Sequence, residues 1–185
     1  MKKVSNLEAF CYDRSMSERK LILLRGYPGS GKTTIGKELE SHGVGKFIDH
    51  NSILTFVAGI AGNDDGIYDE IANLELAISK KLLSEGESVI VARGFSKLAQ
   101  IAVYEAAAES LDIKSLVVRL EVSREELLQR VQSPERQLDF NPTTNEEAAN
   151  DWMNQNPIED HPDEIVIDNN QPFKESVAEI EELLA

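Results

Sequence analysis

The stretch that decides the fold lies near the start of the chain and reads Gly26-Tyr27-Pro28-Gly29-Ser30-Gly31-Lys32-Thr33-Thr34. It fits the pattern of a glycine, four residues of any kind, then Gly-Lys and a serine or threonine. Before it, residues 21–24 are a short apolar run that suits a buried parallel strand, and after it residues 35–40 read as an amphipathic helix. The motif therefore has the strand–loop–helix setting that a phosphate-binding loop requires.

The residue types of this loop suit phosphate binding. Glycines at 26, 29 and 31 let backbone N–H groups turn inward without a Cβ clash, and the following helix adds its positive end. Lys32 is expected to place its charge between the β- and γ-phosphates of a nucleotide, and the Thr33 hydroxyl to ligate Mg²⁺. Pro28 stiffens the loop and lowers the ordering cost of binding. A chance match in a glycine-rich turn is the alternative, and the flanking strand and helix argue against it.

Composition narrows the class of protein. The chain has 185 residues, which suits one domain, and its formal net charge of -14 disfavours nucleic acid and anionic membranes as partners. One cysteine, Cys11, cannot form an internal disulfide, so we expect a reducing, cytoplasmic location. The most apolar stretch, residues 53–62, is too short to span a bilayer. The spacing of the three histidines argues against a zinc site, and the sequence predicts no particular oligomeric state.

Strands and helices are expected to alternate along the chain, which predicts a three-layer α/β sandwich with a parallel sheet and right-handed crossovers. The expected strands cover residues 21–24, 46–49, 88–92, 114–122 and 163–168. The expected helices cover residues 32–42, 52–60, 67–83, 97–110, a segment opened by a capping box at 123–126, and then 145–155 and 173–184. Residues 1–20 are expected to be an extension, either a short packed helix or a frayed end, and residues 132–144 a lid over the site.

Charged residues near the expected strand ends are candidates for the chemistry, because ligands of open parallel sheets bind outside the carboxyl ends of strands. Asp49 ends the second strand and would accept a proton or hold a Mg²⁺-bound water; capping of the next helix is the alternative, and the two can coexist. Arg93 follows the third strand and would clamp substrate, or else form a surface ion pair. Arg130 and Arg136 would stack on adenine and bridge phosphates, or else pair with glutamates.

The order of these parts resembles the small P-loop kinases. The resemblance rests on the loop, on Asp49, on Leu-Glu-Val-Ser-Arg-Glu-Glu-Leu-Leu-Gln-Arg-Val at 120–131 and on Ile-Val-Ile-Asp-Asn at 165–169. It covers about residues 21–184 and is nearest to the group with the 5′-kinase domain of polynucleotide kinase, zeta toxins and chloramphenicol phosphotransferase. It implies a sheet of order 2-3-1-4-5, ATP with Mg²⁺, and phosphoryl transfer to a hydroxyl or phosphate. It also implies that Asp49 is the base, that Arg130 and Arg136 are lid arginines, and that the turn with Asn170 lines the adenine site.

The chain departs from this group at two places. Many relatives carry an aspartate at the end of the third strand, where this chain has Ala92-Arg93. Polynucleotide kinases tend to carry an arginine soon after the second-strand aspartate, where this chain has His-Asn-Ser-Ile-Leu at 50–54. We therefore expect an ATP-dependent kinase of a small molecule. A nucleotide-binding regulatory module with little catalysis is the alternative, and a nucleic-acid 5′-end kinase is disfavoured by the charge.

Overall fold

The computed structural model describes residues 19–61, 67–133 and 145–184. Its centre is a five-stranded parallel sheet of order β2-β3-β1-β4-β5. The strands are β1 (Lys20–Arg25), β2 (Lys46–Asp49), β3 (Val89–Ala92), β4 (Lys114–Glu121) and β5 (Ile165–Asp168). The predicted fold and strand order are confirmed.

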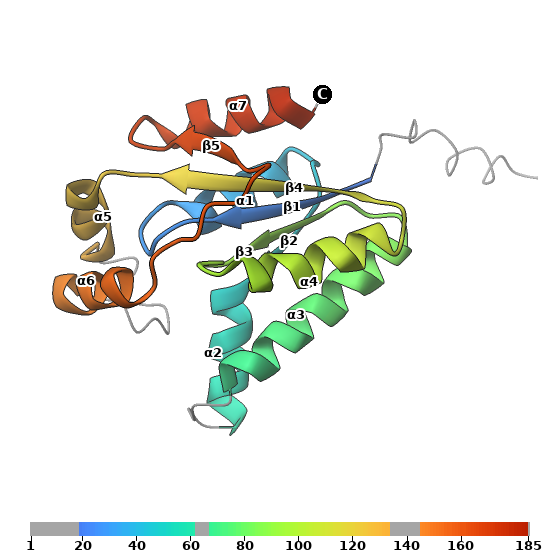
Figure 1. Cartoon of the computed structure of the whole chain (residues 1–185), viewed down its shortest axis with the longest axis horizontal. Helices are drawn as coiled ribbons and strands as arrows, with labels where there is room; N and C mark the ends of the chain where they lie inside the picture. Colours follow the sequence, from blue (N-terminus) through green and yellow to red (C-terminus); the bar gives the residue numbers. More distant parts are fainter. Residues whose placement is uncertain (1–18, 62–66, 134–144, 185) are drawn as a thin grey trace, which may run out of the picture.

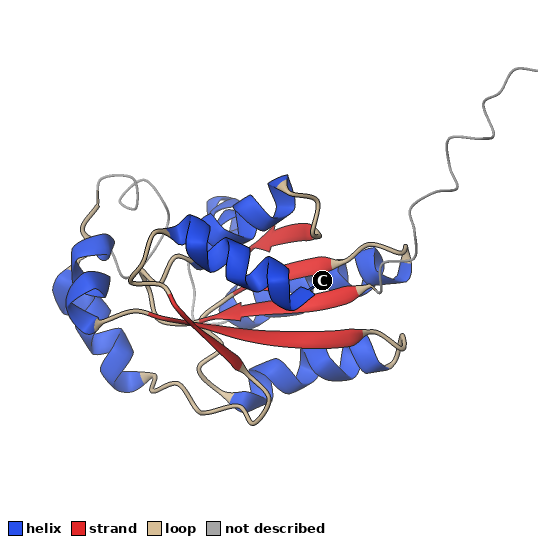
Figure 2. Ribbon diagram, turned by 90° about the horizontal axis from the view of Figure 1, so that it is seen from above, coloured by secondary structure: helices blue, strands red, loops and turns tan. Residues whose placement is uncertain are grey.

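Helices cover both faces of the sheet, so the molecule has three layers. The helices are α1 (Lys32–Ser41), α2 (His50–Ala61), α3 (Ile67–Ser84), α4 (Leu98–Glu109), α5 (Arg124–Val131), α6 (Glu146–Gln155) and α7 (Phe173–Leu184). Figure 1 shows α3 and α4 on one side of the sheet and α7 on the other, with α2 and α3 extending beyond the strands and α5 and α6 beside the strand ends. Figure 2, seen from above, shows the strands between the two helical layers. Within the described residues no helix combines the length and apolar character needed to cross a bilayer.

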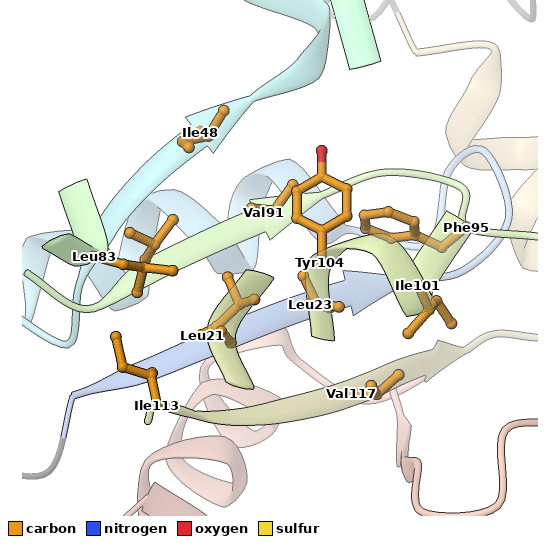
Figure 3. Packing of buried hydrophobic residues seen from close by; sticks show 12 residues of the cluster. Leu21, Leu23, Ile48, Leu83, Val91, Phe95, Ile101, Tyr104, Ile113 and Val117 are labelled. Carbon is orange, nitrogen blue, oxygen red and sulfur yellow. The ribbon is translucent and has the colours of Figure 1, made fainter. Parts of the chain in front are cut away.

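The central strand β1 is buried on both faces, which explains its unbroken apolar sequence. Leu21 and Leu23 pack toward α4 in one core cluster, which Figure 3 shows around Tyr104 and Phe95. Ile22 and Leu24 point to the opposite face and join a second cluster with residues of α1 and α7. Because successive side chains of a strand alternate between faces, one four-residue apolar run fills both cores and holds the loop that follows it.

Three helix starts differ from the sequence prediction, those of α2, α4 and α6, the last of which begins at Glu146 rather than at residue 145. Helix α2 begins at His50 rather than at residue 52, because the Asp49 carboxylate accepts hydrogen bonds from Asn51 N at 3.2 Å and from Ser52 Oγ at 2.7 Å. Helix α4 begins at Leu98 rather than at residue 97, because Lys97 has the extended backbone of an N-cap residue. The capping prediction at Ser123 is confirmed, since its side chain accepts a bond from Glu126 N. Most of the predicted extension and lid, residues 1–18 and 134–144, lie outside the described residues.

Candidate active site

The phosphate-binding loop lies between β1 and α1 and needs its glycines. Gly26, Gly29 and Gly31 have φ values of 146°, 86° and 90°, a region that other residues rarely adopt. Space is short as well: a Cβ on Gly26 would lie 2.8 Å from the Leu120 carbonyl oxygen, and one on Gly31 would lie 2.6 Å from Asn169 Nδ2. Conformation and packing therefore both require glycine, and the turned backbone leads directly into α1.

The Lys32 ammonium lies over this loop. Its Nζ donates to the carbonyl oxygens of Gly26 at 2.9 Å and Tyr27 at 2.8 Å, and to Ser30 Oγ at 3.2 Å. These contacts curl the side chain back from the start of α1 onto the loop that precedes it. A fixed positive charge therefore stands at the N-terminal end of α1, where a polyphosphate would approach.

The residue before the loop is a buried arginine. The Arg25 side chain is fully buried; it pairs with Glu164 Oε2 at 2.8 Å and donates to the Glu159 carbonyl oxygen at 2.8 Å. Burial lowers the pKa of the Arg25 guanidinium, against the opposing effect of the Glu164 carboxylate. Removing one partner of such a pair would leave an uncompensated buried charge, so these contacts tie the connection before β5 to the base of the loop.

Asn169 anchors the loop from the other side, and the sequence prediction missed it. Its side chain is buried; Nδ2 donates to the Ser30 carbonyl oxygen at 2.8 Å, and Oδ1 accepts from Ser176 Oγ at 2.7 Å. Its backbone N–H donates to the Glu121 carbonyl oxygen at 2.8 Å. One residue after β5 therefore holds together the loop, β4 and α7. The available signal was its position directly after the last strand, but the prediction assigned the site role in this turn to the neighbouring Asn170.

A cavity of about 880 Å³ opens beside the loop. Its lining includes Lys32, Thr33 and Thr34 from the start of α1, and His50, Asn51 and Arg93 from the start of α2 and the residue after β3. Arg130 and Asn169 also line it. This volume is in the range of small-molecule sites, roughly 300–1,000 Å³. The cavity therefore joins a phosphate-binding wall to a second polar wall built from α2 and the end of β3.

A buried carboxylate supports the second wall. Glu75 of α3 has a fully buried side chain whose Oε1 lies 2.7 Å from His50 Nδ1 and whose Oε2 lies 3.4 Å from Arg93 Nη1. The buried Tyr104 hydroxyl faces the same group, and burial together with Glu75 raises the pKa of Tyr104 to about 12. The sequence prediction missed Glu75, although a glutamate in the buried stripe Ile67, Ile71, Glu75, Ser79, Leu83 was a usable signal.

The two predicted acceptor-site residues lie differently. Arg93 lines the cavity, with a side chain that is 15% exposed and that pairs with buried Glu75 rather than with a surface carboxylate. Asp49 is not among the residues that line the cavity, and its carboxylate caps α2. The structure thus shows the capping role for Asp49, while its role as a base stays a prediction.

Residues 21–156 match the family described as AAA domain. The chain belongs to this family. No curated protein matches the chain significantly in sequence.

Several solved structures share the fold of this AAA domain. A protein of Chloroflexus aurantiacus is 16% identical with a TM-score of 0.72, over 91% of this chain and 97% of that one. A gluconokinase from Sinorhizobium meliloti is 21% identical with a TM-score of 0.62, over 92% and 93%. The Mycobacterium tuberculosis APS kinase, solved with AMPPNP and APS, is 14% identical with a TM-score of 0.62, over 90% and 98%. The fold that the resemblance to small P-loop kinases implies is confirmed.

The remaining predicted residues of the AAA domain differ in their relation to the cavity. Arg130 donates from Nε to Glu126 at 2.8 Å and from Nη2 to the Asn169 carbonyl oxygen at 2.9 Å, which brings it to the cavity wall. Arg136 lies outside the described residues. The Tyr27 side chain packs against α6, where its ring lies edge-on to the ring of Trp152 with 6.2 Å between the two ring centroids. The nucleotide-binding role of Tyr27 stays a prediction.

Asn170 bonds within its own turn and to the residue before α5. Its backbone N–H and its side-chain amide donate to Asp168 Oδ1 at 3.0 and 2.6 Å, and its Oδ1 accepts from Ser123 N at 2.9 Å. The bonds from Asn170 lower the pKa of the Asp168 carboxyl. Asn170 is not among the cavity-lining residues, and its predicted contact with the nucleotide is untested.

The donor set for Mg²⁺ is small. Among the described residues no group of three histidine, cysteine or acidic side chains is placed to hold a metal ion. Mg²⁺ in nucleotide sites commonly keeps several waters and binds phosphate oxygens with one or two protein groups. The Thr33 hydroxyl, on the cavity wall at the start of α1, fits that pattern.

Proposed function

We propose that this AAA domain is an ATP-dependent kinase that transfers the γ-phosphoryl group to a hydroxyl or phosphate of a small molecule. One observation carries the proposal: the loop with Lys32 and Thr33 and the polar wall with His50 and Arg93 line the same cavity. A nucleotide module without transfer needs only the first wall. A phosphotransferase needs both, because it must hold the donor and the acceptor side by side.

Each part of the site has a role in the proposal. Lys32 and the loop amides would bind the β- and γ-phosphates, and Arg130 with Arg136 would stabilise charge on the transferred group. Thr33 would hold Mg²⁺, which when bound neutralises charge on the phosphates. Arg93 would contact the acceptor. Asp49 remains a candidate base, although its oxygens already accept the two bonds that cap α2.

The proposal also covers the class of acceptor, the cellular location and the bounds of the catalytic unit. The net charge of -14 favours a small molecule over a nucleic acid as acceptor, and one cysteine in the chain favours the cytoplasm. The catalytic unit would cover residues 21–185, with a lid near 132–144 and an extension at 1–20.

The test measures nucleotide binding and transfer separately. Calorimetry with ATP and Mg²⁺ reports binding, and transfer of labelled phosphate from ATP is followed across sugars, sugar acids, polyols, nucleosides, nucleotides and a 5′-hydroxyl oligonucleotide. Wild type is compared with Lys32→Met and with the control Lys80→Met, an exposed lysine on α3. We expect the wild type to bind ATP and to transfer its phosphate. Lys32→Met should lose both activities, and Lys80→Met should keep both. Binding without transfer to any acceptor would favour a regulatory module, and absence of binding would refute the proposal.

A further inference from the structure

His50 lines the cavity that the phosphate-binding loop also lines. It is the first residue of α2 and follows directly on β2, which ends at the carboxyl edge of the sheet. Its side chain is 18% exposed and lines the same cavity as Lys32 and Thr33. A ligand in the cavity can therefore reach this imidazole, while contacts with the protein on its other side hold the ring in place.

The contact behind His50 fixes which ring nitrogen carries the proton. His50 Nδ1 lies 2.7 Å from Oε1 of Glu75, whose side chain is fully buried. A carboxylate accepts hydrogen bonds, so Nδ1 is the protonated nitrogen of the neutral ring and Nε2 keeps a free lone pair. A buried carboxylate also needs positive partners, and Arg93 Nη1 lies 3.4 Å from the other oxygen of Glu75. Glu75 is therefore held in place while it orients the ring.

We propose that His50 is the general base of the transfer reaction and that Glu75 is its positioning residue. This inference rests on the kinase function proposed above, and it selects a hydroxyl as the acceptor, because a phosphate acceptor needs no base. The hydroxyl oxygen forms a bond to the γ-phosphorus of ATP. The bond from that phosphorus to the bridging oxygen breaks with its electron pair left on ADP, and the hydroxyl proton passes to His50 Nε2 and then to water.

Geometry favours His50 over its neighbour Asp49 for this role. The carboxylate of Asp49 accepts bonds from Asn51 N and Ser52 Oγ, and Asp49 is not among the cavity-lining residues. His50 lines the cavity, and its partner Glu75 occupies only Nδ1. The cap at Asp49 sets the start of α2 and thereby the position of His50. In this proposal the Asp49 carboxylate caps the helix and the His50 imidazole accepts the proton.

The kinetic test compares His50→Gln with a matched histidine variant. We expect His50→Gln to lower kcat by about 10²–10⁴-fold, the usual contribution of a general base, with the calorimetric affinity for AMPPNP unchanged. The control is His42→Gln: His42 Nδ1 also lies 2.7 Å from a glutamate, Glu181 Oε1, but its side chain is 44% exposed and does not line the cavity. We expect full activity in this control. A larger loss in Asp49→Asn than in His50→Gln would overturn the inference and return the role to Asp49.

A spectroscopic test needs neither an acceptor nor a folded variant at position 50. Two-bond ¹H–¹⁵N spectra of the full chain labelled in its three histidines distinguish the two neutral tautomers and the imidazolium. We expect the His50 signals, identified from variants at the other two histidines, to show the Nδ1–H tautomer at neutral pH. The Nε2–H tautomer or an imidazolium would refute the base, since neither offers Nε2 as an acceptor. Glu75→Gln should weaken the tautomer preference and lower kcat less than His50→Gln does.

The two proposals can fail separately. If AMPPNP does not bind, the kinase function fails, whatever the histidine spectra show. If AMPPNP binds and phosphate is transferred but His50→Gln keeps its turnover, only the role of His50 fails. If AMPPNP binds and no acceptor is phosphorylated, the tautomer of His50 still tests the inference, because only the Nδ1–H form leaves Nε2 able to accept a proton.

Discussion

Replacing Asn169 with alanine is expected to loosen the phosphate-binding loop without changing any residue of it. The side chain donates to the Ser30 carbonyl oxygen at 2.8 Å and accepts from Ser176 Oγ at 2.7 Å. Asn169 is 1% exposed and both Ser30 and Ser176 are fully buried, so water cannot easily replace either bond. Asn169→Ala therefore leaves a buried carbonyl and a buried hydroxyl without these partners.

The size of the effect follows from those two groups. Each buried polar group that loses its partner costs about 1–3 kcal/mol, so with two such groups the free energy of unfolding should fall by roughly 2–6 kcal/mol. For a chain of this size that lowers Tm by roughly 4–24 °C, at about 2–4 °C per kcal/mol. Because the loop carbonyl of Ser30 is then untethered, the Kd for ATP should rise about tenfold, equivalent to about 1.4 kcal/mol.

Thermal unfolding and calorimetry with ATP measure the two effects, and Asn170→Ala is the matched control one residue away. Asn170 is exposed and bonds to Asp168 and Ser123 N, so its removal should lower Tm less. If Asn169→Ala keeps wild-type Tm and ATP affinity, the anchoring role is wrong. If Asn170→Ala weakens ATP binding more than Asn169→Ala, the nucleotide contact predicted for Asn170 is favoured instead.

Three further variants test single features. Lys32→Ala should abolish measurable ATP binding by calorimetry; unchanged affinity would remove Lys32 from the phosphate site. Gly31→Ala should destabilise the fold by about 1–3 kcal/mol, because φ is 90° and the new Cβ would lie 2.6 Å from Asn169 Nδ2; a wild-type melting curve would contradict this. Tyr104→Phe should be close to wild type at neutral pH but more stable in alkali. Burial and Glu75 raise the folded-state pKa of Tyr104 to about 12 from 10.0, so the wild type loses about 2–3 kcal/mol as pH rises through this window, and denaturant melts at both pH values should show the divergence.

The sequence predicted the features that depend on residues close together in the chain. The conformation of the loop at 26–34 depends on its own glycines at positive φ. The apolar run of β1 predicts a strand that is buried on both faces. Asp49 at a strand end was predicted as a base or a cap, and the structure shows the cap. The strand order followed from the family resemblance rather than from any residue pattern.

The pairing of His50 with Glu75 could not be predicted in the same way. The two residues are 25 positions apart and meet because α2 and α3 pack against each other. A single glutamate in an apolar stripe signals a buried carboxylate, but its partner depends on how the helices cross. The choice between Asn169 and Asn170 has a similar cause, since adjacent residues after a strand point in different directions.

The sequence by itself determined that a phosphate-binding loop lies between a buried strand and a helix, because backbone geometry and charge over nine residues are local properties. Tertiary structure decided what faces that loop: His50, Arg93 and Asn169 come from three separate parts of the chain, and they share one cavity. Their positions depend on sheet register and helix packing, which involve contacts between residues far apart in the sequence.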